Sequence, residues 1–63
     1  MRLTAFWERM GEAFGPHADP FSRDHVLGTL GQRTVREALA QGESAKDVWR
    51  AVCAEMDVPA RLR

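Results

Sequence analysis

The chain has 63 residues, of which 44% are hydrophobic and 29% charged, with nine Lys and Arg residues, nine Asp and Glu residues and one cysteine. This length permits one domain with a single core, and the zero net charge provides no overall attraction to nucleic acid or to an anionic membrane. A single cysteine excludes an internal disulfide and a zinc site built on paired cysteines.

The first predicted helix lies between Thr4 and Gly15-Pro16. Thr4 is expected to cap its start, because a threonine hydroxyl can accept a hydrogen bond from a backbone amide of the first turn. Leu3 and Trp7 lie at the margin of an inward apolar stripe, whose members recur at i, i+4, i+7 and i+8 and are Phe6, Met10, Ala13 and Phe14. Gly15-Pro16 should end the helix, since proline cannot continue the hydrogen-bond pattern.

A second helix is predicted to begin at Asp19-Pro20 and to end at Gly31, with the aspartate as its cap and the proline in its first turn. Its buried face is expected to consist of Val26, Leu27 and Leu30. Phe21 does not fall on that face. Either the helix starts irregularly or Phe21 fills a gap against a neighbouring element.

The third predicted helix begins at Thr34, which forms a capping box with Glu37 three residues later. Its inward residues are Val35, Ala38 and Leu39, and Gly42 ends it. A helix of this length is not stable alone in water, so packing must hold it.

The fourth predicted helix is capped by Ser44 and closed by Val58-Pro59, because the residue before a proline avoids helical angles. Asp47, in its first turn, suits the positive end of the helix. Its apolar face is broad and consists of Ala45, Val48, Trp49, Val52, Cys53 and Met56.

No segment alternates between apolar and polar residues with period two, so no sheet is expected. The predicted fold is all-α: a compact bundle of four short helices, the last two in a helix-turn-helix-like hairpin. Residues 1–58 form the single helical domain, and residues 59–63 form a frayed C-terminal tail from which Leu62 can pack back. So small a core predicts modest stability, to which a partner or a second copy of the chain would add.

Several blocks of the sequence occur together in one known family. They are Met1-Arg2-Leu3-Thr4, Phe6-Trp7-Glu8-Arg9-Met10, Asp24-His25-Val26-Leu27, Arg33-Thr34-Val35, Ala38-Leu39-Ala40 with Gly42, Val48-Trp49-Arg50-Ala51-Val52-Cys53 and Asp57-Val58-Pro59. Over essentially its whole length the chain therefore resembles the short actinobacterial family named domain of unknown function 3046. It departs from the family pattern at Gln32, where a second glycine is expected after Gly31. The family has no established activity, so the resemblance implies no functional residue.

Two tryptophans in 63 residues lie beside charged residues, and tryptophan and arginine supply much of the binding energy at protein interfaces. One hypothesis is therefore a small non-enzymatic interaction or regulatory module that binds a protein partner, and the alternative for the same side chains is core packing. The residues of the predicted aromatic and arginine patch are Leu3, Phe6, Trp7, Met10, Trp49 and Arg50.

The alternative function is DNA binding, weak or sequence-specific, through a helix-turn-helix formed by residues 34–57. Its basic residues would be Arg33, Arg36, Lys46 and Arg50. Residues 43–57 carry four acidic and two basic side chains, and Glu43 and Asp47 lie near the end that would enter the groove. Since DNA phosphates repel such an end, the charge disfavours this reading.

No catalytic, cofactor or metal site is predicted. His17, Asp19, Asp24 and His25 lie close in sequence, but without the spacing of a histidine pair on one helix. Cys53 is expected as a small buried hydrophobe, because neither histidine is near it in sequence to activate the thiol.

No apolar run approaches the ~20 residues of a membrane span. The first residues meet charge too early for a secretory signal. A cytoplasmic protein without membrane contact is therefore expected.

Overall fold

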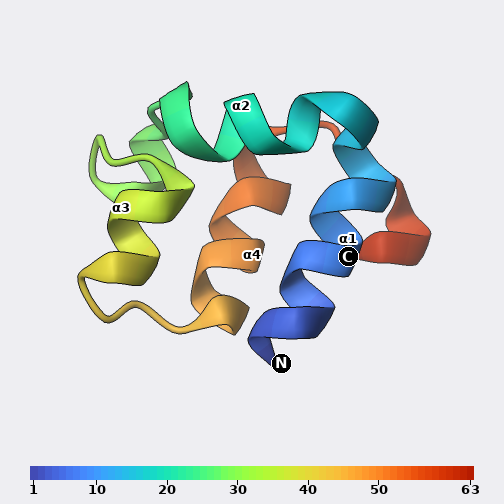
Figure 1. Cartoon of the computed structure of the whole chain (residues 1–63), viewed down its shortest axis with the longest axis horizontal. Helices are drawn as coiled ribbons and strands as arrows, with labels where there is room; N and C mark the ends of the chain where they lie inside the picture. The colour runs from blue at the N-terminus through green and yellow to red at the C-terminus, as the bar shows by residue number, and fades with distance from the viewer.

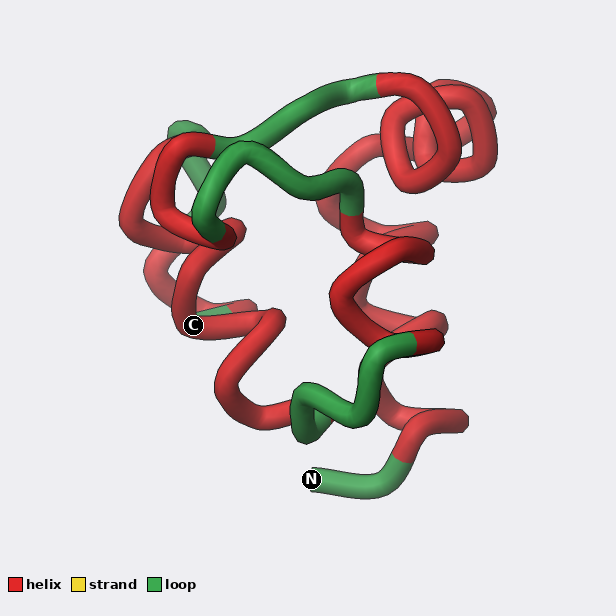
Figure 2. Tube along the Cα trace, turned by 90° about the vertical axis from the view of Figure 1, so that its left-hand side faces the viewer, coloured by secondary structure: helices red, strands yellow, loops and turns green.

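The computed structural model describes residues 1–63 and is all-helical. Its α-helices are α1 (Leu3–Phe14), α2 (Ala18–Asp24), α3 (Val35–Ala40) and α4 (Ala45–Glu55), and its 3-10 turns are η1 (Gly15–His17), η2 (Gly28–Leu30) and η3 (Ala60–Leu62). The all-α prediction is confirmed, and Figure 2 shows a trace of helices joined by short loops, without a strand. None of the helices combines the length and the apolar character needed to cross a membrane.

The helices α1 and α4 lie side by side, with α3 on the other side of α4 and α2 across one end of the bundle (Figure 1). After α4 the chain passes under α2 and returns beside α1 as η3. The radius of gyration is 10.3 Å, close to the value of about 10.6 Å that a folded chain of this length should have. The elements are therefore closely packed around one core.

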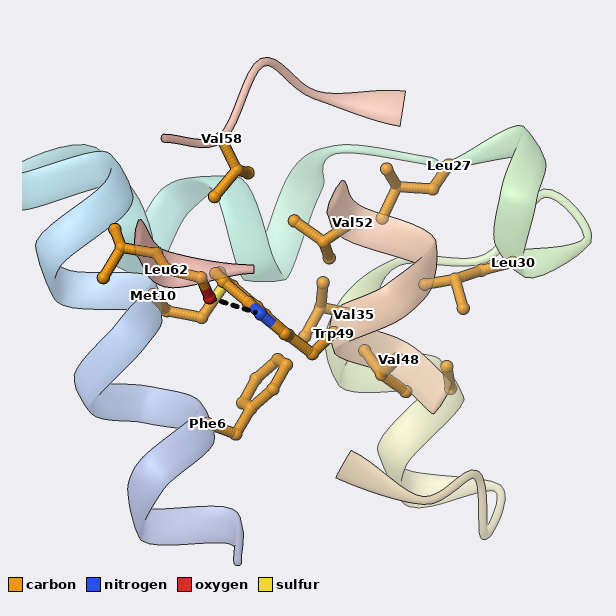
Figure 3. Packing of buried hydrophobic residues seen from close by; sticks show 11 residues of the cluster. Phe6, Met10, Leu27, Leu30, Val35, Val48, Trp49, Val52, Val58 and Leu62 are labelled. Atoms are coloured by element: carbon orange, nitrogen blue, oxygen red, sulfur yellow. Dashed lines mark hydrogen bonds between the residues drawn. The ribbon is translucent and has the colours of Figure 1, made fainter. Parts of the chain in front are cut away.

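The centre of that core is the indole of Trp49, between α1 and the C-terminal segment (Figure 3). Its ring meets Phe6 edge to face, with centroids 5.9 Å apart, and its Nε1 donates a hydrogen bond to the carbonyl oxygen of Leu62 at 2.9 Å. The other buried apolar side chains are Met10, Leu27, Leu30, Val35, Ala38, Val48, Val52, Val58 and Leu62. Residues of α1, α3, α4, the η2 region and the C-terminal segment thus share one core, to which α2 contributes no fully buried apolar side chain.

The start of α1 differs from the sequence expectation. Arg2 is the N-cap and makes no side-chain capping bond, whereas Thr4 lies inside the helix. The prediction of Thr4 as the cap was wrong because the helical hydrogen bonds already begin with Phe6 N donating to Arg2 O. The predicted end is confirmed: Gly15 follows the last residue, with a φ of 57°.

The second predicted helix was wrong in both position and length. α2 ends at Asp24, and His25 is already extended, with φ −82° and ψ 116°. Leu27 then forms an isolated bridge with Arg33, so its side chain reaches the core from an extended segment, whereas Val26 points outward and is 49% exposed. Leu30 is buried through the separate turn η2.

Phe21 follows the second of its two predicted alternatives. Its ring stacks on Phe14 of α1, with centroids 4.5 Å apart, and on His25 at 4.9 Å. It thereby fills the space between α1 and α2. The predicted cap residue Asp19 lies inside α2, and its carboxylate pairs with Arg36 of α3 and with Arg23.

The turn after η2 places two consecutive residues in the left-handed region of the backbone. Gly31 and Gln32 both have positive φ, 66° and 64°. Only glycine adopts such angles without steric cost, so the position of Gln32 is one that favours glycine.

The caps of α3 and α4 are confirmed. Thr34 Oγ1 accepts from the amide of Glu37 at 3.1 Å, and Glu37 Oε1 accepts from the amide of Thr34 at 2.8 Å. Ser44 Oγ accepts from the amide of Asp47 at 3.0 Å. α4 ends at Glu55, three residues before the predicted Val58-Pro59, because the backbone becomes extended at Met56.

The C-terminal segment is ordered against the core, so the expected fraying was wrong. Leu62 packs back as expected and is only 5% exposed. Arg61 pairs with Glu12 of α1 at 3.3 Å, and Arg63 Nε donates to the carbonyl oxygen of Val58 at 2.9 Å. The Arg61 pair joins η3 to α1, and the Arg63 bond is internal to the C-terminal segment.

Candidate binding groove

The predicted aromatic and arginine patch is not one exposed surface. Phe6, Met10 and Trp49 are almost completely buried, so three of its six members serve the core. Leu3 is 51% exposed, Arg50 is exposed, and Trp7 is half-buried. The ring of Trp7 packs edge to face on Phe6 at 5.1 Å.

A depression of about 500 Å³ lies between α1, α4 and the C-terminal segment. We call it the basic groove, and its lining residues are Met1, Arg9, Lys46, Trp49, Arg50, Cys53 and Arg63. The buried Trp49 and the half-buried Cys53, one turn apart on α4, are the part of the lining that we call its base. The rest of the lining consists of Met1 and four basic side chains, without an acidic one.

Local helix geometry explains one side of the groove. Lys46, Arg50 and Cys53 recur at i, i+4 and i+7 and so share one face of α4. Arg9 comes from α1 and Arg63 from the end of the chain, and both are close enough to Cys53 for their charges to act on its thiol. Three separate segments thus bring positive charge to one place.

The basic residues of the groove lack the counter-charges that other arginines have. Four of the five arginines outside it pair with carboxylates: Arg23 with Asp24, Arg33 with Glu43, Arg36 with Asp19 and Arg61 with Glu12. Inside the groove, Arg9 and Lys46 have no carboxylate within ion-pair distance, and Arg50 reaches Asp47 only at 4.0 Å. Three of the four cations thus have no partner carboxylate, which leaves a local positive potential that attracts an anion.

Comparison with known proteins identifies the family but not an activity. The model of the family described as "Protein of unknown function (DUF3046)" matches residues 1–61. The chain belongs to this family. No curated protein and no solved structure matches it. The function of this DUF3046 protein is therefore inferred from the residues on its own surface.

Cys53 is the one thiol in the basic groove. Burial raises the pKa of its thiol, and the nearby cations of Arg63 and Arg9 oppose this shift without cancelling it. Because the thiolate is the reactive form, the thiol is less reactive at neutral pH than an ordinary exposed cysteine.

Replacing Arg63 or Arg9 with alanine is expected to raise the pKa of Cys53 further, since each change removes a cation that stabilises the thiolate. At a fixed pH near neutrality, alkylation by neutral iodoacetamide should slow. The measurement is the pH profile of the alkylation rate, whose midpoint should move to higher pH. Arg23→Ala on α2 is the matched control and should leave the profile unchanged, whereas a lowered midpoint in the groove variants would contradict the placement of the two arginines.

The structure separates the four basic residues of the DNA-binding alternative. Arg33 donates to Leu30 O at 2.7 Å and to Gln41 Oε1 at 2.8 Å, and it pairs with Glu43 at 2.6 Å. Arg36 is bound to Asp19 and Ser22. Only Lys46 and Arg50 remain together. Arg9, Arg63 and the exposed side of Cys53 lie beside Lys46 and Arg50 and were not predicted as their neighbours from the sequence. The one sequence signal for the groove is the helical spacing of Lys46, Arg50 and Cys53.

The histidines and acids near α2 form no cation site. Asp24 pairs with Arg23, and His25 Nε2 lies 3.7 Å from Glu55 while its ring stacks on Phe21. No group of three or more His, Cys, Asp or Glu side chains is arranged to hold a metal ion. The open depression beside His17 and Pro20 is smaller than the basic groove, at about 380 Å³.

Proposed function

We propose that this DUF3046 protein is a non-enzymatic interaction module whose basic groove binds an acidic segment of a partner protein. The observation that carries the proposal is the set of four basic side chains that surround the groove without an acidic neighbour in its lining. In a chain of zero net charge this arrangement concentrates positive potential at one site. An acidic partner segment supplies the missing counter-charge.

The titratable groups of the groove favour binding over catalysis. General acid and base catalysis needs groups that exchange protons near neutral pH. The groove offers four positively charged side chains and one thiol whose pKa is raised. We place the interaction in the cytoplasm, where a free thiol such as Cys53 stays reduced.

DNA binding by residues 34–57, with α3 and α4 as a helix-turn-helix, is the second candidate. Lys46 and Arg50, one turn apart on α4, favour it. Duplex DNA carries a charge every ~1.7 Å, so it would extend beyond these two residues toward Glu43 and Asp47, which repel it. A short acidic segment can contact the cations without extending to Glu43 or Asp47. We therefore prefer an acidic protein segment to DNA as the ligand of the groove.

Reversing one charge of the groove tests the proposal. A short glutamate-rich peptide should bind the wild-type protein, and Arg50→Glu should weaken binding about tenfold or more, because it replaces an attraction by a repulsion. Trp7→Phe leaves Trp49 as the only tryptophan, so the change in its emission on titration measures binding at the groove.

The matched control is Arg23→Glu, which makes the same charge change at an exposed arginine outside the groove and should bind the peptide nearly as well as the wild type. Equal weakening by both variants would mean that net charge, not the groove, governs binding. Binding of duplex DNA but not of the peptide at about 50 mM salt would favour the helix-turn-helix instead.

A further inference from the structure

We infer that the basic groove recognises a segment in which one apolar side chain is flanked by carboxylates, with the apolar side chain seated over Trp49 and Cys53. The inference rests on the proposed function and adds what the acidic segment must contain. The four basic side chains of the groove would bind the carboxylates, and Trp49 and Cys53 would contact the apolar residue.

The base of the groove has no free strong hydrogen-bond donor. The only polar atom of the Trp49 ring, Nε1, already donates to Leu62 O at 2.9 Å. The remaining group is the Cys53 thiol, which is a weak donor and behaves as a small hydrophobe. A polar ligand group placed there would lose its water without gaining a partner. An apolar side chain instead removes apolar surface of both molecules from water.

The cations of the groove come from separate segments of the chain. Lys46 and Arg50 lie on the α4 side, and Arg9 and Arg63 come from α1 and the C-terminal segment. The rise of an α-helix places Arg50 about 4.5 Å and Lys46 about 10 Å from Cys53 along α4. These distances correspond to about one to three residues of extended chain.

An extended segment of that length fits the arrangement of charges. Its side chains alternate, so a central apolar residue that faces the base leaves its two neighbours on the open side. Lysine and arginine have long side chains that can reach carboxylates there while their stems stay on the protein surface. The recognised core is therefore acidic–apolar–acidic.

A nucleic-acid duplex would use only half of these features. Its phosphates could meet the cations, but its bases are paired and stacked inside the duplex, so no apolar group reaches the base of the groove. A binding mode that depends on both features should also lose less affinity with added salt than a purely ionic one.

The test compares three capped peptides of equal length with the central sequences Asp-Leu-Asp, Asp-Ser-Asp and Asn-Leu-Asn. Binding is followed by Trp49 emission in the Trp7→Phe protein and by protection of Cys53 from iodoacetamide. We expect Asp-Leu-Asp to bind about tenfold more tightly than Asp-Ser-Asp, the fold-change that partial burial of a leucine provides. Cys53→Ser, which makes the base more polar, should reduce that preference. Circular dichroism checks that the variant is folded.

Each outcome has a separate meaning. Equal binding of Asp-Leu-Asp and Asp-Ser-Asp would overturn the inference and leave the proposed function intact, because an acidic segment would still be recognised. Binding of Asn-Leu-Asn as tight as that of Asp-Leu-Asp would overturn both, since charge would then play no part. Protection of Cys53 by single-stranded DNA at concentrations where Asp-Leu-Asp gives none would also overturn both, in favour of a nucleic-acid ligand.

Discussion

Replacement of Trp49 by alanine is expected to lower the free energy of unfolding by about 3–5 kcal/mol. The indole is 3% exposed, packs on Phe6 and donates a hydrogen bond to the carbonyl oxygen of Leu62. A domain of this length has roughly 3–9 kcal/mol of stability in total, so the variant should be largely or wholly unfolded. Urea denaturation followed by circular dichroism measures the loss.

Two further variants show which part of the indole matters. Trp49→Phe keeps an aromatic ring but leaves the Leu62 carbonyl oxygen without its donor, so it should cost about 1–3 kcal/mol. Trp7→Ala removes a half-buried ring and should cost clearly less than Trp49→Ala. If Trp7→Ala were the more damaging change, the placement of Trp49 at the centre of the core would be wrong.

The parts of the fold that the sequence predicts well are those governed by local interactions. The capping box of Thr34 and Glu37 and the cap at Ser44 join residues three apart, so the amino acids of one turn decide them. The inward stripes of α1 and α4 follow from helical spacing in the same way.

The second helix was mispredicted because long-range bonds determine that region. Leu27 and Leu30 fit a helical stripe, yet both reach the core from non-helical backbone. Thr29 Oγ1 donates to Ala51 O at 2.9 Å, and the Thr29 amide donates to Glu55 Oε1 at 3.2 Å, which holds η2 against α4. No pattern within residues 19–31 indicates these partners.

The candidate site was only partly predictable for a related reason. Phe6, Met10 and Trp49 were predicted both as members of a binding patch and as members of the inward helical stripes. A buried ring cannot also be an exposed anchor, and the structure places all three in the core. Arg50 and Lys46 were identified from α4 itself. Arg9 and Arg63 join them only because α1 and the C-terminal segment pack beside α4, which is a tertiary arrangement.

Leu62→Ala is expected to cost about 2–5 kcal/mol of the free energy of unfolding, the range for a buried leucine in a small core. The side chain is 5% exposed, and the same residue supplies the acceptor for Trp49. Urea denaturation with the Trp49 emission as the signal measures the loss. A mobile tail would give no such effect, so this variant separates an ordered η3 from the frayed end that the sequence suggests.

Leu3→Ala is the matched control, because it makes the same change at a leucine that is 51% exposed and should alter stability by no more than about 0.5 kcal/mol. Leu62 also precedes Arg63, whose Nε donates to Val58 O within the same segment. Loosening η3 should therefore displace one of the four cations of the basic groove and weaken peptide binding even where the protein stays folded. Stability and binding that both survive Leu62→Ala would mean that the C-terminal segment completes neither the core nor the groove.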